Sequence, residues 1–358
     1  MHQSELIFFG SFLVGILLIL IFDLGVLNRH SHVIRFREAM IWTVIWVTLG
    51  LGFYVFLLFQ GHLLHGLSDL SSIQDIILRH KHPVNINGMD LDQALQAYRS
   101  NLALEYLTGY LIEYALSVDN VFVMIMIFYG FGVKEKYFKW ILFWGILGAI
   151  IMRFLFIFVS AALIHRFEWI LYVFGAFLIL TGYLMYRNRN KKERIEPAHH
   201  PVVRFSRRFL AVYPRIVGHR LFIRNRNGKW FVTPLFIVLL VIEFTDVIFA
   251  IDSVPAIFSI TKDPYIVFFS NIFAIIGLRS LFFLVMHVMN SFRFLKTGLS
   301  VLLIFIGSKM MVHDILAGWG FKTVHSLIVV AGILAVSVGA SLLWPERQGS
   351  ADPDPLRE

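Results

Sequence analysis

Three carboxylates interrupt a long apolar run between residues 231 and 260. They are Glu243, Asp246 and Asp252, and Ser253 follows the last of them. An ionised side chain near the centre of a bilayer costs about 2.5–3.5 kcal/mol on insertion scales. If this run crosses a membrane, three acids within it indicate a functional site.

A second stretch repeats the acidic pattern. It contains Glu113, Asp119 and Asn120. When Asp119 is placed on Asp252, Glu113 falls on Asp246, so each segment has another acid six residues before its matched aspartate. We expect the rest of the chain to hold these two segments together inside a membrane.

The composition supports a membrane protein. Of 358 residues, 58% are hydrophobic and only 15% are charged, whereas a soluble chain carries about 25% charged residues. The absence of cysteine excludes thiolate ligation and weakens the case for a soft-metal site. The first apolar run, residues 6–27, lacks the basic start and small-residue exit of a cleavable signal peptide.

Nine apolar runs have the roughly 20-residue length that a spanning helix needs. We therefore predict an all-α polytopic membrane protein with about nine transmembrane helices. The runs are 6–27, 39–59, 102–129, 138–162, 169–186, 231–260, 266–289, 294–311 and 324–344.

Lys and Arg in the connections predict the orientation, because cytoplasmic loops are enriched in them. Residues 187–229 hold thirteen Lys and Arg against two acids, which indicates a basic cytoplasmic loop. The N-terminus is then outside, the C-terminus is cytoplasmic, and residues 61–101 form an external segment. Basic and aromatic residues alternate over 204–226, as in an RNA-binding arm, but we interpret this stretch as a basic amphipathic segment that contacts anionic lipid.

The likeness between the two acidic segments extends into the following spans. Residues 148–156 resemble 273–282 with one insertion, which pairs Arg153 with Arg279, and residues 175–182 resemble 300–307. Under the predicted topology the two sets of three spans run in opposite senses. This predicts an inverted 3+3 repeat, as in many secondary transporters, with the substrate site at the repeat interface.

The predicted organisation has seven parts. They are two N-terminal spans (1–60), the external segment (61–101), the first three-helix repeat (102–186), the basic cytoplasmic loop (187–230), the second repeat (231–311), a C-terminal span (312–344) and a cytoplasmic tail (345–358).

Helix geometry limits how the acids meet. Six residues correspond to about 240° around an ideal helix, so Glu113 and Asp119 do not share a face. A break at Pro255, which cannot hydrogen-bond to the Ile251 carbonyl, would help the acids of the second repeat converge. Without breaks, we expect two half-sites at different depths.

The candidate ligands all present oxygen, which suits hard divalent cations such as Mn²⁺, Ca²⁺ or Mg²⁺. They are Glu113, Asp119, Asn120, Glu243, Asp246, Asp252 and Ser253. The alternative is structural, with Asp119 paired to Arg153 and Asp252 to Arg279 as buried ion pairs. The acids outnumber these bases, which favours a cation, or protonation of the excess carboxylates.

Other polar residues carry weaker indications. Lys309 either extends towards the interface or pairs with an acid and exchanges charge with a bound cation. Four histidines of the external segment, His62, His65, His80 and His82, are expected to be solvated rather than to form a metal-capturing patch. The chain has no recognisable nucleophile–base pair or phosphate loop, so we do not expect an enzyme or a permanently bound cofactor.

At its acidic segments the chain resembles the TerC/Alx family of integral membrane proteins, within the lysine-exporter-like superfamily. The matching stretches are Leu107-Thr-Gly-Tyr-Leu-Ile-Glu113, Ala115-Leu-Ser-Val-Asp119-Asn120-Val-Phe-Val, Glu243-Phe-Thr-Asp246-Val-Ile-Phe-Ala-Ile-Asp252-Ser253-Val-Pro255-Ala-Ile-Phe and Gly307-Ser-Lys309-Met. The resemblance implies a Mn²⁺ exporter of the bacterial inner membrane. The family's acidic positions fall on Glu113, Asp119, Glu243, Asp246 and Asp252. The segment 67–92 looks longer than expected for the family.

The acidic segments predict a carboxylate site for a hard cation, with protons as a candidate coupling ion. The resemblance implies that the cation is Mn²⁺, moved by efflux, and adds a link to alkaline or tellurite stress. Two alternatives stay open at this stage. One is an exchanger for Ca²⁺ or another divalent cation. The other is a non-transporting scaffold for envelope stress or membrane-protein biogenesis. The oligomeric state is not indicated by the sequence.

Overall fold

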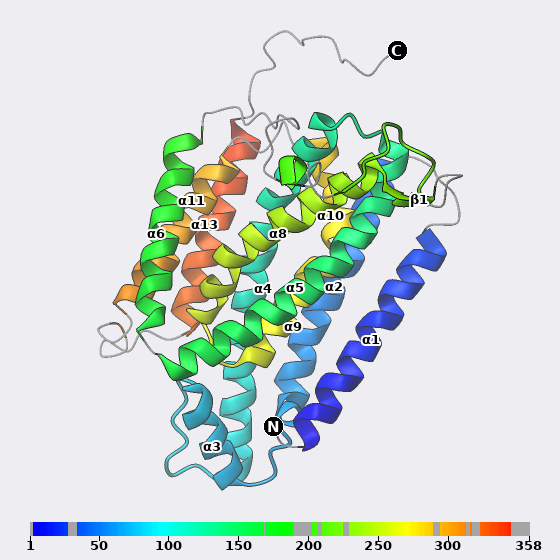
Figure 1. Cartoon of the computed structure of the whole chain (residues 1–358). Helices are drawn as coiled ribbons and strands as arrows, with labels where there is room; N and C mark the ends of the chain where they lie inside the picture. The colour runs from blue at the N-terminus through cyan, green and yellow to red at the C-terminus, as the bar shows by residue number, and fades with distance from the viewer. Residues whose placement is uncertain are drawn as a thin grey trace.

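A computed structural model describes residues 3–27, 34–167, 169–189, 202–205, 210–224, 229–288, 294–312, 316 and 323–344. Within these residues the chain is mostly helical (Figure 1). The helices are α1 (Gln3–Leu27), α2 (Phe36–Gln60), η1 (Gly61–Leu64), α3 (Leu70–His80), α4 (Leu91–Gly130), η2 (Glu135–Tyr137), α5 (Phe138–Arg166), α6 (Ile170–Asn188), α8 (Pro234–Phe258), α9 (Pro264–Ile276), α10 (Leu278–Val288), α11 (Leu295–Met311) and α13 (Thr323–Leu343).

The helix lengths confirm a multi-pass membrane protein. Among the described residues, six helical segments are long and apolar enough to span a bilayer, or seven if the bent pair α9–α10 counts as one span. Each of the nine predicted apolar runs lies on a helix or on this pair. The remaining two runs fall on α1, whose apolar part is Ile7–Ile19, and on the 17-residue α11. The count of nine spans therefore stays a prediction.

The predicted single helix over residues 266–289 is wrong, because the chain bends there by 51° between α9 and α10. Gly277 lies at the bend. A Cβ on this residue would lie 3.3 Å from Cβ of Trp46, so glycine lets α2 approach closely. Ser280 Oγ donates a hydrogen bond to the Gly277 carbonyl at 2.9 Å, which satisfies a backbone acceptor at the bend.

The break expected at Pro255 is also wrong, since α8 runs through this proline to Phe258. Proline forfeits one backbone hydrogen bond, the one to the Ile251 carbonyl. That loss falls in the last turn, where α8 ends only three residues later. Beyond the proline, the Ser259 amide donates to the Pro255 carbonyl at 3.1 Å, so the helix closes normally.

The segment between α2 and α4 forms a small cap on one end of the bundle. α4 has 40 residues, about 60 Å at 1.5 Å per residue, so it exceeds a bilayer core and carries its first turns beyond it. α3 lies beside this extension (Figure 1) and buries Ile73, Ile76 and Ile77. Both helices begin with a capping box, at Asp69 and at Asp90.

The cap overturns the expectation of solvated histidines. His65, His80 and His82 are 3%, 6% and 5% exposed. His65 contacts Asp263, His82 contacts Glu105, and the ring of His80 lies between the other two. The segment is rich in polar residues, so its composition predicts exposure. The burial results from tertiary packing.

The described part of the predicted basic loop contains a β-hairpin, so the fold is not purely α. Strand β1 (Phe222–Arg224) pairs antiparallel with β2 (Trp230–Val232). Figure 1 places this hairpin at the end of the bundle opposite to α3. Phe222 and Trp230 are exposed, and contact of this segment with lipid stays a prediction.

The central helices pack in a reciprocal pattern. α4 packs against α9 while α8 packs against α5, and α6 lies along α11. A Cβ on Gly175 would lie 3.0 Å from the Gly307 carbonyl oxygen. A Cβ on Gly182 would lie 2.8 Å from the Ser300 carbonyl oxygen. In the predicted repeat Gly175 matches Ser300 and Gly182 matches Gly307, so one contact maps onto the other.

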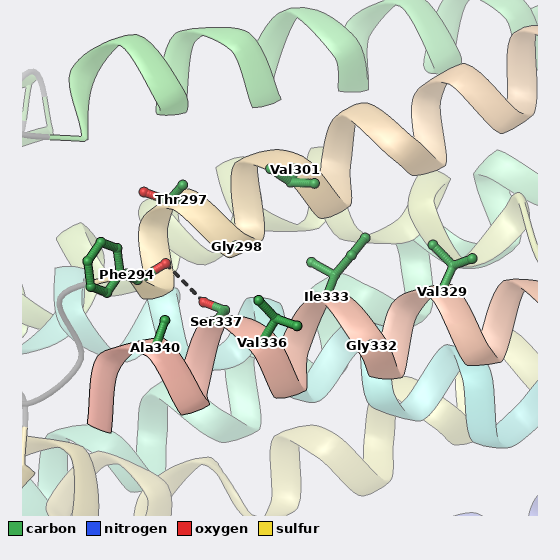
Figure 2. Close-up of a pocket in the computed structure, with 10 residues that line it drawn as sticks. All are labelled: Phe294, Thr297, Gly298, Val301, Val329, Gly332, Ile333, Val336, Ser337 and Ala340. Carbon is green, nitrogen blue, oxygen red and sulfur yellow. Dashed lines mark hydrogen bonds between the residues drawn. The ribbon is translucent and has the colours of Figure 1, made fainter. Parts of the chain in front are cut away.

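The last helix closes the α11 side of the bundle. α13 contacts α4 and α11, and Figure 2 shows Ser337 of α13 donating to the Phe294 carbonyl at 2.9 Å. Gly298 makes room for this serine, because a Cβ there would overlap its side chain. The adjoining pocket is lined almost entirely by apolar side chains and contains none of the candidate acids.

Candidate functional site

Arg153 of α5 forms the centre of the buried charge network. Its side chain is 1% exposed. Nη1 donates to Oε1 of Glu113 on α4 and, at 2.6 Å, to Oδ1 of Asn271 on α9. Nη2 lies 3.7 Å from Oδ1 of Asp246 on α8. The guanidinium therefore joins the acids at matched positions of the two proposed repeats.

This cluster leaves a charge imbalance when both acids are ionised. Glu113 and Asp246 together carry two negative charges against one positive charge on Arg153, which does not lose its proton in proteins. Both carboxylates are buried, at 0% and 2% exposure. Ser253 Oγ adds a polar contact 3.4 Å from Nη1, so four helices supply the groups of this cluster.

A second cluster contains the other matched pair of aspartates. Thr181 of α6 donates to Oδ1 of Asp252 on α8 at 3.3 Å. Thr181 also lines a cavity of about 260 Å³ that Asp119 of α4 borders. Asn188 and Lys296 line the same cavity, so it contains carboxylate, amide and hydroxyl oxygens together with one amine.

Glu243 occupies a third place, between α8 and α5. It is half-buried and lines a cavity of about 750 Å³ that is otherwise mainly apolar. Gly148 provides the space, because a Cβ at that position would overlap the Glu243 carboxylate. Phe205, from the predicted basic loop, also lines this cavity.

The structure thus does not gather all seven predicted ligands around one point. It places Glu113, Asp246 and Ser253 around Arg153, Asp119 and Asp252 at Thr181, and Glu243 in a separate cavity. The reason is that α4 and α8 are continuous through their acids, and acids six residues apart on an unbroken helix face different directions. For unbroken helices we expected two half-sites at different depths, and the structure separates the acids into three places.

The remaining predicted residues lie on α4, α5, α10 and α11. Asn120 is buried on α4, and Arg279 is buried on α10 at 5% exposure. Arg153 contacts Glu113 and Asp246, whereas Asp119, its predicted partner, borders the Thr181 cavity. Lys309 Nζ donates to the Ser259 carbonyl at 2.9 Å, where α8 ends.

Sequence reasoning missed Thr181 and Asn271. Both are polar residues within apolar runs, which is the only indication the sequence offers. Neither has a polar counterpart in the other repeat, so the internal alignment did not select them. Asn271 is fully buried, and its Nδ2 donates to the Val267 carbonyl at 2.8 Å. This bond fixes the orientation of the side-chain amide whose Oδ1 accepts the hydrogen bond from Arg153.

The chemistry of these clusters is that of hard-cation binding and charge exchange. Asp119, Asp252, Asn188 and Thr181 offer oxygen donors of the kind that Mn²⁺, Mg²⁺ and Ca²⁺ prefer. At the other acidic pair, Glu113 and Asp246, the guanidinium of Arg153 supplies the positive charge. The described residues therefore hold one pair of acids neutralised in part, and a second pair in which Asp119 borders a cavity and Asp252 is hydrogen-bonded to a residue of its lining.

Comparison with known proteins identifies the family. A family model described as "Integral membrane protein TerC family" matches residues 98–349. An uncharacterized membrane protein of Myxococcus xanthus is 37% identical over 345 residues, covering 96% of this chain and 95% of that protein. An Escherichia coli K12 protein named putative membrane-bound redox modulator Alx is 39% identical over 329 residues, covering 92% of each chain. No solved structure matches the chain. The chain belongs to the TerC family of integral membrane proteins.

Proposed function

We propose that this protein exports divalent cations, with Mn²⁺ as the main substrate, from the cytoplasm across a bacterial inner membrane. The observation that carries the proposal concerns Asp119 and Asp252, which occupy matched positions of the two segments. Asp252 accepts a hydrogen bond from Thr181, and Thr181 and Asp119 line the same cavity of about 260 Å³. A buried excess of carboxylates in a membrane protein is costly unless a cation or protons balance it.

The reciprocal helix contacts support an inverted repeat as the frame for transport. In a two-fold arrangement, every contact between two residues recurs between the two residues that the symmetry pairs with them. The contacts of Gly175 with Gly307 and of Gly182 with Ser300 follow this rule. A nine-span chain with a 3+3 core is therefore the architecture that we propose.

Arg153 has a specific part in this proposal. In the conformation described, it neutralises Glu113 and Asp246 in part, while Asp119 and Asp252 receive the cation. Rocking of one repeat against the other would then expose the site to the opposite side, as in other inverted-repeat transporters. Protons returning on the vacated carboxylates are the coupling we propose.

The experiment is cellular manganese content in a Mn²⁺-sensitive bacterial strain that expresses the chain. The parent lowers manganese, whereas Asp119→Asn and Asp252→Asn do not, at equal membrane levels. Asp75→Asn is the matched control, because Asp75 is an exposed acid on α3 paired with Arg79. Unchanged manganese with the inserted parent would contradict Mn²⁺ export, and competition by Ca²⁺ would identify the broader exchanger.

The scaffold alternative is separable by a deletion. It requires that removal of the basic loop 187–229 abolishes the stress phenotype while neutralised acids leave it intact. Some relatives are named redox modulators. This chain contains no cysteine, so it has no thiol that could take part in such a role. We therefore propose transport, and no enzymatic activity, for this protein.

A further inference from the structure

A cluster of imidazoles and one carboxylate lies beneath the α3 cap, away from the transport site proposed above. His65 follows η1, His80 is the last residue of α3, and Asp263 caps the N-terminus of α9. One ligand atom from each of the three side chains lies within 4.8 Å of the other two. All three residues are buried, and Asp263 is 0% exposed.

We propose that His65, His80 and Asp263 bind a divalent transition-metal ion of the Zn²⁺ class at this end of the bundle. Two imidazole nitrogens and one carboxylate oxygen form a donor set that zinc sites use, with the remaining coordination position open. Imidazole suits Zn²⁺, Cu²⁺, Fe²⁺ and Ni²⁺ better than Mg²⁺ or Ca²⁺. The site therefore differs in chemistry from the all-oxygen ligand set at Thr181, and it does not depend on the proposed transport.

The distances are near those of a coordination sphere. Metal–ligand bonds of about 2.0–2.1 Å place neighbouring donor atoms about 3.0–3.4 Å apart. His65 Nε2 already lies 2.9 Å from Asp263 Oδ2. The rings of His65 and His80 have centroids 5.5 Å apart, and the three ligand atoms lie within 4.8 Å of one another.

The carboxylate is prepared for this role by its surroundings. Asp263 Oδ1 accepts the Tyr265 amide at 2.9 Å, which leaves Oδ2 directed at the histidines. The 2.9 Å separation of Oδ2 from His65 Nε2 shows this direction.

A second layer of hydrogen bonds surrounds the three residues. His82 Nδ1 lies 3.0 Å from Glu105 Oε1, which directs its Nε2 to within 3.9 Å of Asp263 Oδ2. Glu105 is held by Asn101 at 2.7 Å and by Thr261 at 2.6 Å. Thr261 Oγ1 also accepts the Asp263 amide at 3.2 Å, so this network holds the backbone of one proposed ligand, as outer hydrogen bonds do in metal sites.

A purely structural role is the competing account. In that account the histidines and Asp263 form a hydrogen-bond network that fastens α3 to α9, and no metal enters. The two accounts differ in a measurable way, because only the first predicts stoichiometric metal binding with imidazole ligands.

The test uses the full chain purified in detergent, without a polyhistidine tag and freed of metal by chelation. The background variant His199→Gln/His200→Gln removes a histidine pair outside the described residues. We expect one Zn²⁺ per chain by isothermal titration calorimetry. His80→Gln and Asp263→Asn should each weaken binding at least tenfold, and Asn at 263 retains the helix-capping oxygen. His62→Gln, in the same segment but outside the set, should bind like the parent.

X-ray absorption of the Zn²⁺-loaded parent gives a readout that needs no variant. Two imidazole ligands in the zinc shell are expected. Absence of stoichiometric Zn²⁺ binding, unchanged affinity in both ligand variants, or a shell without imidazole would overturn the site. Asp119→Asn and Asp246→Asn should leave Zn²⁺ binding intact, so failure of this site and failure of the transport proposal are distinguishable.

Discussion

Arg153 is the residue on which the buried charge balance depends. It contacts Glu113 and Asp246 from two different helices and is itself 1% exposed. Removing one partner of a buried ion pair leaves an uncompensated charge, which costs about 3–5 kcal/mol. Arg153 therefore contributes to the stability of the fold as well as to the proposed exchange of charge.

Arg153→Met should strongly lower the thermal stability of the purified protein, because two carboxylates lose their shared cation. Adding Glu113→Gln should restore part of the loss, since one buried charge is then removed. Unfolding followed by intrinsic tryptophan fluorescence in detergent measures both. Equal melting temperatures for Arg153→Met and the parent would contradict this role.

Thr181→Val tests the second cluster at nearly constant side-chain volume. The variant removes the hydroxyl that donates to Asp252 at 3.3 Å, so we expect a several-fold higher KM for Mn²⁺ transport. Thr181→Ser retains the hydroxyl and should resemble the parent. Identical kinetics for the valine and serine variants would remove Thr181 from the site.

The sequence predicted the acids but not their partners. The internal repeat located Glu113, Asp119, Asp246 and Asp252, since spacing is visible in a linear chain. It proposed Asp119 as the partner of Arg153, whereas the structure places Glu113 and Asp246 there. Which side chain reaches a given arginine depends on helix rotation and depth, which residue spacing alone does not determine.

At the scale of helices, proximity of α6 and α11 depends on glycine. A Cβ on Gly182 would lie 2.8 Å from both the Ser300 carbonyl oxygen and Cγ1 of Ile304. One of these neighbours is backbone, so it cannot rotate away. The two helices would have to separate to admit a larger residue.

Gly182→Val should therefore destabilise the protein by about 1–3 kcal/mol, the usual cost of overpacking. Gly332→Ala in α13 is the matched control, because no atom of the described residues outside its own helical neighbourhood lies within 4 Å of the position that its Cβ would take. Denaturant or thermal unfolding compares them. A neutral Gly182→Val would contradict the close packing of α6 on α11.

The sequence predicted where helices occur but not where a helix is interrupted. Nine apolar runs all fall on helices, because length and hydropathy are local properties. The bend lies at Gly277, where Trp46 approaches, and not at Pro255, where α8 is about to end. The burial of His65 and His82 similarly involves contacts that are distant in sequence, with Asp263 and Glu105.

At the scale of the molecule, the two ends of the bundle carry different structures. The α3 cap lies at one end and the β-hairpin at the other (Figure 1). The Lys and Arg distribution predicts that the cap is external and the hairpin cytoplasmic. The family and the helices do not by themselves determine this orientation.

The absence of native cysteine makes the orientation directly measurable. Leu78→Cys on the cap and Trp230→Cys on β2 are both exposed positions, at 67% and 65%. A membrane-impermeant maleimide applied to intact spheroplasts should label the first and spare the second until the cells are permeabilised. The reverse pattern would invert the predicted topology.

The most direct test of the account is Mn²⁺ uptake into inside-out membrane vesicles, in which export from the cytoplasm appears as accumulation. The account predicts uptake by the parent, faster with an acidic lumen that supplies returning protons, and none by Asp119→Asn or Asp252→Asn. Equal uptake at every proton gradient would remove the coupling. No Mn²⁺ uptake by correctly inserted parent protein would contradict the central claim.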